Sequence, residues 1–277
     1  MRRGHCRVFL CFGLASFSWA FPLISRTFSE VNLPPLTLQP QQIDFSTFDL
    51  TSSLPPAYIT LSMPIALPAS CATYVGAEQE CTSEMTALTV AFEDCGDMFT
   101  VCRCADAQMS TDTVLDRLGR VPVGLRRYVG VVIVLNDTEP NAYTLFNGDI
   151  HFFGDCAMDT WVHEMTHAFD FASPTPQSNS SDWAAALAGD SCVPDDYSLT
   201  NRVEDFAQVG VLKTYILLHG GTLPPGFVVD CMANQLAFVD SLALYDPGPL
   251  FGNTCHIIDN GPVARFVCAS VQPITRI

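Results

Sequence analysis

The sequence predicts an α+β fold with a small mixed sheet, one motif-bearing helix and a mostly helical C-terminal half. Residues 129–135 are apolar and mostly β-branched, which is typical of a buried strand. Residues 201–218 and 228–245 instead have the length and composition of helices, and Gly220 and Gly221 end the first of them. Ten cysteines after the N-terminal segment predict that disulfides stabilise this fold.

Length and composition indicate one folded domain with an N-terminal extension. The chain has 277 residues, of which 48% are hydrophobic and 15% charged, so a sizeable core can form and global disorder is disfavoured. Residues 21–68 are rich in Pro, Ser and Thr and contain no cysteine, which predicts an extended arm or a pro-segment. We assign the domain itself to residues 69–277.

Residues 1–20 have the features of a secretory signal peptide. Three arginines precede the apolar run 8–19, and Ser18 and Ala20 place small side chains before a cut after Ala20. The run is too short to cross a hydrocarbon core of about 30 Å, which argues against a membrane anchor. We therefore expect a secreted, extracellular protein with no membrane span in the mature chain.

The charge of the chain excludes one class of partner. The formal net charge is −16, and removal of the three arginines of the signal peptide changes it from −16 to −19. Such a surface repels nucleic-acid phosphates and anionic membranes, so we expect no nucleic-acid partner. The sequence leaves the oligomeric state open.

The cysteines that remain after the signal peptide are even in number, which in a secreted chain predicts up to five disulfides. Cys102 and Cys104 are two residues apart, so we expect each to bond elsewhere. A thiolate zinc site is disfavoured because no paired CxxC motifs occur. Asn136 and Asn179 begin N-glycosylation sequons, which we place on surface loops. The ten cysteines are Cys71, Cys81, Cys95, Cys102, Cys104, Cys156, Cys192, Cys231, Cys255 and Cys268.

Apolar spacing and turn residues divide the domain into elements. We expect helices at 82–94, 111–119, 157–171, 183–187, 201–218 and 228–245, and strands at 129–135 and 143–153.

The helix predicted at 157–171 contains His163-Glu164-Met165-Thr166-His167. Residues four apart share a helix face, so both imidazoles can reach one Zn²⁺, and we expect one zinc ion per chain. Glu164 lies beside them, where it can take a proton from a metal-bound water. The alternative is a helix with two ordinary core or surface histidines.

A third protein ligand is needed, and Glu204 is the best donor. It lies 37 residues after His167 on the next long helix, from which a carboxylate can reach the metal. The alternative is an ordinary first-turn carboxylate that the helix dipole favours. Asp182, Asp190 and Asp170 are competing candidates for the third ligand, although the short side chain of Asp170, three residues after His167 on the same helix, reaches the metal poorly.

Residues 161–210 resemble the gluzincin metallopeptidases of the lethal-factor and Pro-Pro-endopeptidase branch. Tyr197 stands seven residues before Glu204, as in that branch, and Phe206 and Ala207 occupy the family's positions. The chain departs from the pattern at two places: Gln208 stands where the family usually has Glu, and Thr166 where it often has Gly.

The resemblance implies a zincin-like fold and a secreted zinc metallo-endopeptidase that hydrolyses polypeptides. Glu164 would then be the general base, and Tyr197 would donate a hydrogen bond to the developing oxyanion. Asp170, three residues after the second histidine, would orient a ligand imidazole.

Residues 147–153 could form an edge strand that binds the substrate backbone, with Gly148, His151 and Phe153 as contact residues. The alternative for this segment is a core strand.

Two other functions remain open at this stage. The chain is also similar to the deuterolysin-type aspzincin peptidases in Thr166, secretion and disulfide content, although their Gly-Thr-x-Asp motif is absent. Asp182 or Asp190 would then be the third ligand. The second alternative is a catalytically inactive, zinc-free secreted protein that binds a partner or has a structural role.

Overall fold

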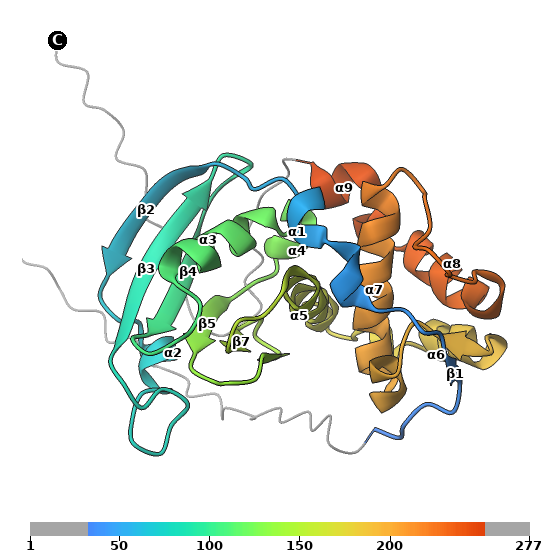
Figure 1. Cartoon of the computed structure of the whole chain (residues 1–277), viewed down its shortest axis with the longest axis horizontal. Coiled ribbons are helices and arrows are strands. Elements are labelled where there is room, and N and C mark those ends of the chain that lie inside the picture. The colour runs from blue at the N-terminus through green and yellow to red at the C-terminus, as the bar shows by residue number, and fades with distance from the viewer. Residues whose placement is uncertain (1–32, 253–277) are drawn as a thin grey trace, which may run out of the picture. The chain divides into compact units, whose positions relative to one another are not determined.

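The computed structural model describes residues 33–252. The elements below belong to one compact unit, which begins at residue 34. A six-stranded sheet forms one part of this unit and a group of helices the other, with helix α5 between them (Figure 1).

The sheet is mixed, as predicted, and its strands have the order β2-β3-β4-β5-β7-β6. Strands β2, β3 and β4 are antiparallel neighbours, β4, β5 and β7 are parallel, and β6 pairs antiparallel with β7. The strands are β2 (Ile59–Ile65), β3 (Met85–Phe92), β4 (Cys95–Cys104), β5 (Val131–Leu135), β6 (Asn141–Thr144) and β7 (Ile150–Phe153). The edges of this sheet are therefore β2 and β6.

Strand β3 corrects the helix predicted at 82–94. Thr86, Thr89 and Val90 are β-branched, and such side chains lose rotamer freedom in a helix but pack well on a pleated surface. Antiparallel pairing with β4, in which Leu88 lies opposite Val101, stabilises the extended form. The spacing of the apolar residues fits both the helical period of 3.6 and the strand period of 2, so it could not decide between the two.

The single strand predicted at 143–153 is a hairpin. The chain reverses between β6 and β7, where Gly148 has a φ of 80° and its N–H donates to the carbonyl of Leu145 over 2.8 Å. A positive φ favours glycine because it carries no Cβ. Strand β7 therefore lies between β5 and β6, and only β6 has a free edge on that side.

The helices agree better with the sequence-based prediction, and the second half of the described chain is mostly helical. Predicted helices at 111–119, 157–171, 183–187 and 201–218 are confirmed, whereas the last one is shorter than 228–245. The helices are α1 (Leu50–Ser53), α2 (Ala69–Ala72), α3 (Thr111–Arg120), α4 (Val123–Arg126), α5 (Met158–Phe171), α6 (Ser181–Gly189), α7 (Arg202–Leu218), α8 (Ala233–Ser241) and α9 (Pro247–Phe251). The α+β prediction is confirmed, and the zincin-like description stays a prediction.

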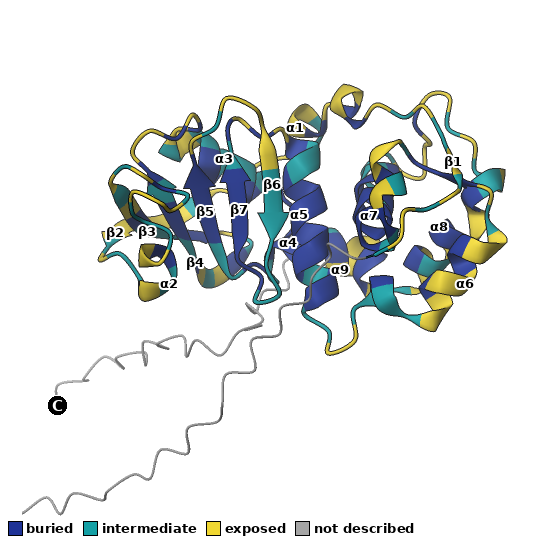
Figure 2. Cartoon of the chain, turned by 90° about the horizontal axis from the view of Figure 1, so that it is seen from below, coloured by how far each residue is buried: buried dark blue, intermediate teal, exposed yellow. Residues whose placement is uncertain are grey.

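Helix α5 is buried on several sides (Figure 2). On one side Trp161 stacks on Phe152 of β7, with ring centroids 4.0 Å apart. On the other side α5 contacts α7 very closely at Gly210, where an added Cβ would lie 2.6 Å from the Thr166 methyl group and 2.5 Å from the Tyr245 hydroxyl. The sheet and α7 thus fix the position of α5.

Part of the predicted arm belongs to the folded unit. Phe45, Phe48 and Leu54 are buried in the main hydrophobic core, and β2 completes one edge of the sheet. Strand β1 (Gln39–Pro40) pairs in parallel with β8 (Cys192–Val193). Burial of these side chains explains why the segment is ordered, whereas its removal as a pro-segment stays a prediction.

Three disulfides lie within the described residues: Cys71–Cys102, Cys81–Cys104 and Cys192–Cys231. Cys95 is also disulfide-bonded. Cys102 and Cys104 bond to different partners, as expected. Cys156 is a buried free thiol, so the prediction that all ten cysteines pair is wrong at this position.

Three predicted features lie outside the described residues, namely the signal peptide, Cys255 and Cys268. Between residues 33 and 252, no helix is long and apolar enough to cross a membrane.

Candidate metal centre

Helix α5 places His163 and His167 on its face toward α7. The helix has Asp159 in its first turn, where a carboxylate interacts favourably with the helix dipole. One turn separates the two histidines, and their side chains are 7% and 5% exposed. Both imidazoles are therefore held in the interface between the two helices.

Helix α7 contributes Glu204 from its first turn. The Asn201 side chain caps this helix, because its Oδ1 accepts from the N–H of Val203 at 2.8 Å and of Glu204 at 3.1 Å. Glu204 is buried, and its carboxylate points toward the two imidazoles. The cap thus fixes the backbone that carries the third candidate ligand.

The three side chains bring their ligand atoms together. His163 Nε2 lies 3.0 Å from His167 Nε2 and 3.0 Å from Glu204 Oε2, and the remaining distance, between His167 Nε2 and Glu204 Oε2, is 3.3 Å. Two ligands about 2.1 Å from a tetrahedral zinc ion are about 3.4 Å apart. The observed spacing therefore fits three ligands of one small cation.

The electrostatics of this cluster also favour a cation. Burial acts to raise the pKa of Glu204, but the charges and hydrogen bonds of His167 and His163 outweigh it, and the pKa lies below its usual value. The carboxylate is thus ionised, as a metal ligand must be. Two imidazole nitrogens and a carboxylate oxygen that face one point repel each other unless a proton or a metal ion lies between them.

Gln208 and Asp195 lie behind His163, in two roles that the sequence did not predict. His163 Nδ1 lies 2.9 Å from Gln208 Oε1, and Gln208 Nε2 lies 2.5 Å from Asp195 Oδ2. Burial raises the pKa of Asp195 above its usual value. The position of Gln208, one turn after Glu204, could have indicated that it faces the same helix.

Glu164 follows His163 on α5, and the Tyr197 ring lies near the His163 ring. Glu164 is buried, and its Oε2 accepts a 2.7 Å hydrogen bond from the Thr144 hydroxyl on β6. Tyr197 is 53% exposed, and its ring centroid lies 5.6 Å from that of His163. With Gln41 and Asp195, among others, Tyr197 lines an open hollow of about 280 Å³.

Asp170 is held by the loop after α5. Its two oxygens accept from the Ser178 N–H at 3.0 Å and the Ser178 hydroxyl at 2.5 Å. Burial raises the pKa of Asp170, and the nearby charge of His167 acts in the opposite direction. Its predicted action on a ligand imidazole stays a prediction.

None of the competing aspartates joins the three ligands. Asp182 is exposed on α6. Asp190 accepts hydrogen bonds from the side chains and N–H groups of Asn234 and Gln235. Of these candidates for the third ligand, Asp170 included, the geometry brings only Glu204 to the histidines.

The segment 147–153 is not the expected edge strand. His151 and Phe153 lie on β7, which is paired on both sides, so its backbone cannot take up an added strand. His151 is fully buried, with Nδ1 2.7 Å from Glu80 Oε2 and 3.0 Å from the Tyr143 hydroxyl. Gly148 forms the hairpin turn.

The two sequons differ in their surroundings. Asn136 is exposed, as expected for a glycosylation site. Asn179 is half-buried, and its Oδ1 accepts from Arg202 at 2.6 Å. Glycosylation of both stays a prediction.

Comparison with known proteins identifies the family. Residues 45–248 match the model of the family described as conidiation-specific protein Con-13. The chain belongs to the Con-13 family. It is similar to "Conidiation-specific protein 13" of Neurospora crassa, with 36% identity over 155 residues, which are 53% of this chain and 44% of that relative. No solved structure matches the chain.

Membership of the Con-13 family corrects the functional prediction. The assignment to the gluzincin metallopeptidases is wrong, and the peptidase function and the hydrolase class fall with it. The catalytic roles predicted for Glu164 and Tyr197 depended on that assignment and fall with it. The polypeptide partner and the absence of a nucleic-acid partner stay predictions.

Proposed function

We propose that this Con-13 family member is a secreted protein that binds one Zn²⁺ through His163, His167 and Glu204. The observation that carries the proposal is the convergence of three buried ligand atoms, all within 3.3 Å of one another. Such an arrangement costs free energy unless a proton or a metal ion lies between the three atoms, and a metal ion would bind all three at once.

The donor set favours zinc over the common hard cations. Ca²⁺ and Mg²⁺ take six or more oxygen ligands, whereas this site offers two imidazole nitrogens and one carboxylate oxygen. Zinc binds such ligands in tetrahedral geometry and leaves the fourth position to water or to another ligand. Copper competes for imidazole sites and is therefore a necessary comparison in the experiment.

A bound zinc ion would join α5 to α7. His163 and His167 come from one helix and Glu204 from the other, so the metal would cross-link the sheet-packed helix to the helical half. We also propose that the fold is zincin-like, on the basis of this pair of helices. The binding free energy would then contribute to the stability of the whole unit.

Secretion is the second part of the proposal. Three disulfides in the described residues fit an oxidising compartment. Together with the N-terminal sequence of residues 1–20, they support export to the extracellular space.

The name of the Neurospora crassa relative associates that protein with conidiation. We extend this setting to the present chain and expect its protein level to rise when the source organism forms conidia. Quantitative immunoblotting of vegetative and conidiating cultures tests the expectation, and equal levels in both would remove this part of the proposal.

Metal analysis of the purified protein tests the zinc site. We expect about one zinc per chain after dialysis against metal-free buffer, and loss of that zinc in His167→Ala. The matched control is His219→Ala, because His219 lies just after α7 and contacts the Tyr215 carbonyl instead of the three ligands. Titration with Zn²⁺, Cu²⁺, Ca²⁺ and Mg²⁺ shows which ion is preferred. Equal zinc content in the wild type and His167→Ala would overturn the proposal.

A further inference from the structure

We propose that Gln208 and Asp195 are positioning residues that hold His163 with its Nε2 lone pair toward the metal. The inference rests on the zinc site proposed above and adds two residues that do not touch the ion. Its physical basis is a chain of hydrogen bonds in which each partner fixes the donor or acceptor role of the next.

The chain starts at Asp195, which only accepts. Its Oδ1 accepts from both the N–H and the hydroxyl of Ser198 at 2.9 Å, and its Oδ2 faces Gln208 Nε2 at 2.5 Å. A carboxylate cannot donate, so the amide of Gln208 must turn its NH₂ group toward Asp195. This contact decides the orientation of the amide.

The orientation of Gln208 then determines the tautomer of His163. The amide oxygen faces His163 Nδ1 at 2.9 Å and can only accept, so Nδ1 must carry the proton. A neutral imidazole protonated at Nδ1 has its lone pair at Nε2, the atom that faces His167 and Glu204. The hydrogen-bond chain therefore prepares the ligand atom before a metal arrives.

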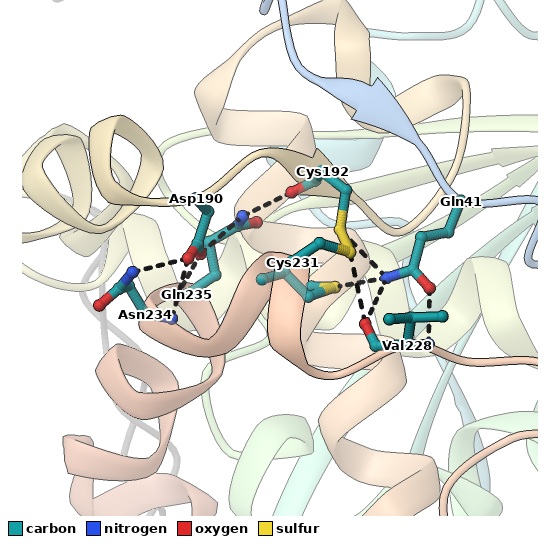
Figure 3. The surroundings of a disulfide bond; sticks show 8 residues. Gln41, Asp190, Cys192, Val228, Cys231, Asn234 and Gln235 are labelled. Carbon is teal, nitrogen blue, oxygen red and sulfur yellow. Dashed lines mark hydrogen bonds between the residues drawn. A yellow bond between two sulfur atoms is a disulfide. The ribbon is translucent and has the colours of Figure 1, made fainter.

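The segment that carries Asp195 is fixed at the end nearest the Cys192–Cys231 disulfide. Figure 3 shows this disulfide beside Gln41, whose side chain contacts Cys192 and both backbone groups of Val228. In the same view Asp190 binds Asn234 and Gln235 at the start of α8. Asp195 follows Cys192 by three residues, so the disulfide limits how far this carboxylate can move.

The first experiment compares zinc affinity in single variants, measured by competition with a chromophoric chelator. Gln208→Leu removes the acceptor for Nδ1–H, and we expect zinc affinity to fall by about 10- to 100-fold. The control is Gln108→Leu, because Gln108 also bridges two groups, Asn136 and the Asp137 N–H, but does so away from the metal centre. We expect this control to keep wild-type affinity.

Exchange of the carboxylate at position 195 with the amide at position 208 separates a positioning role from simple packing. Asp195→Asn alone allows the Gln208 amide to turn over, and Gln208→Glu alone places two carboxylates together, so each should weaken zinc binding. In the double variant the new amide at position 195 can donate to the new carboxylate at position 208, and that carboxylate can still accept from His163 Nδ1. We expect the double variant to regain affinity to within about threefold of the wild type, and the absorption spectrum of its Co²⁺ complex to return to the wild-type form.

The outcomes distinguish the two proposals. If the wild type binds zinc and Gln208→Leu binds it equally well, or if the double variant is weaker than both single variants, the positioning role is overturned. If the wild type binds no zinc, the metal site itself fails. The melting temperature of each zinc-free variant shows whether a loss of affinity merely reflects unfolding.

Discussion

Two buried histidine clusters in the described part of the chain have similar residues, but they differ in how their polar atoms are paired. His163 and His167 contact Glu204 between α5 and α7. His151 contacts Glu80 and Tyr143, and these three residues are called the sheet cluster. Each cluster contains an imidazole nitrogen within about 3 Å of a glutamate oxygen.

The difference lies in the balance of donors and acceptors. In the sheet cluster, the Tyr143 hydroxyl donates to Glu80 Oε1 and His151 Nδ1 can donate to Glu80 Oε2, so each of these donors has an acceptor, whereas His151 Nε2 has no hydrogen-bond partner among the described residues. Between the helices, two imidazole nitrogens and one carboxylate oxygen face a single point, where a shared proton or a bound cation would lie between all three. A buried histidine beside a glutamate thus indicates a metal site only when the lone pairs converge.

The largest expected effect is a loss of zinc affinity that occurs on substitution of Glu204 but not of Glu80. Glu204→Gln removes the charged ligand and should lower zinc affinity by at least about 100-fold, since an amide is a much poorer zinc ligand than a carboxylate. Glu80→Gln is the matched substitution in the sheet cluster and should leave zinc affinity unchanged. Competition titrations measure both, and an equal loss in the two variants would show that the clusters do not differ in this way.

Removal of the metal should lower the melting temperature of the protein only when the cluster between α5 and α7 is intact. At free zinc 100 times above Kd, binding stabilises the folded state by about 2.7 kcal/mol. For a unit of this size we expect a chelator to lower the melting temperature by about 5–10 °C. The same chelator should leave the melting temperature of His167→Ala unchanged, and a similar decrease in that variant would point to a metal bound elsewhere.

The sheet cluster should contribute stability without any metal. Tyr143→Phe leaves Glu80 without the tyrosine donor and should destabilise the fold by about 1–2 kcal/mol. Urea unfolding with and without zinc checks the expectation. Because the cluster lies outside the metal centre, the loss should be the same under both conditions.

The smallest effect concerns pH. Burial lowers the pKa of His151, and the charge of Glu80 offsets this only in part. Below about pH 6.5 the unfolded chain therefore binds a proton that the folded chain does not, so stability falls as pH falls, by at most about 1.4 kcal/mol per pH unit. In His151→Gln this contribution should vanish between pH 7 and 5, which chemical unfolding at several pH values can detect.

The sequence was sufficient to predict that His163, His167 and Glu204 come together. The spacing of His163 and His167 predicts a shared helix face because an α-helix repeats every 3.6 residues. Glu204 was predicted from its place in the first turn of the next long helix and from its offset to Tyr197. The helical repeat is a local property that the sequence pattern preserves, whereas the offset between Tyr197 and Glu204 rested on the resemblance to the gluzincins.

Features that depend on distant contacts could not be predicted. Asp195 lies in a segment without periodicity, and its role follows from the Cys192–Cys231 disulfide and the Ser198 contacts. His151 was expected at an exposed edge, yet the hairpin adds β6 outside β7 and buries it. The overall function was mispredicted because a ligand pattern defines a metal site and not a reaction.

The contact at Gly210 has a consequence for the choice of ion. Because α5 and α7 lie so close at Gly210, we expect the helix separation there to influence the distance between the histidine nitrogens and the Glu204 carboxylate, and with it the ionic radius that the site accepts. A methyl group at position 210 would separate the helices and enlarge the coordination shell, which should penalise Zn²⁺ more than the larger Cd²⁺. A glycine that touches no ligand would in this way tune metal selectivity.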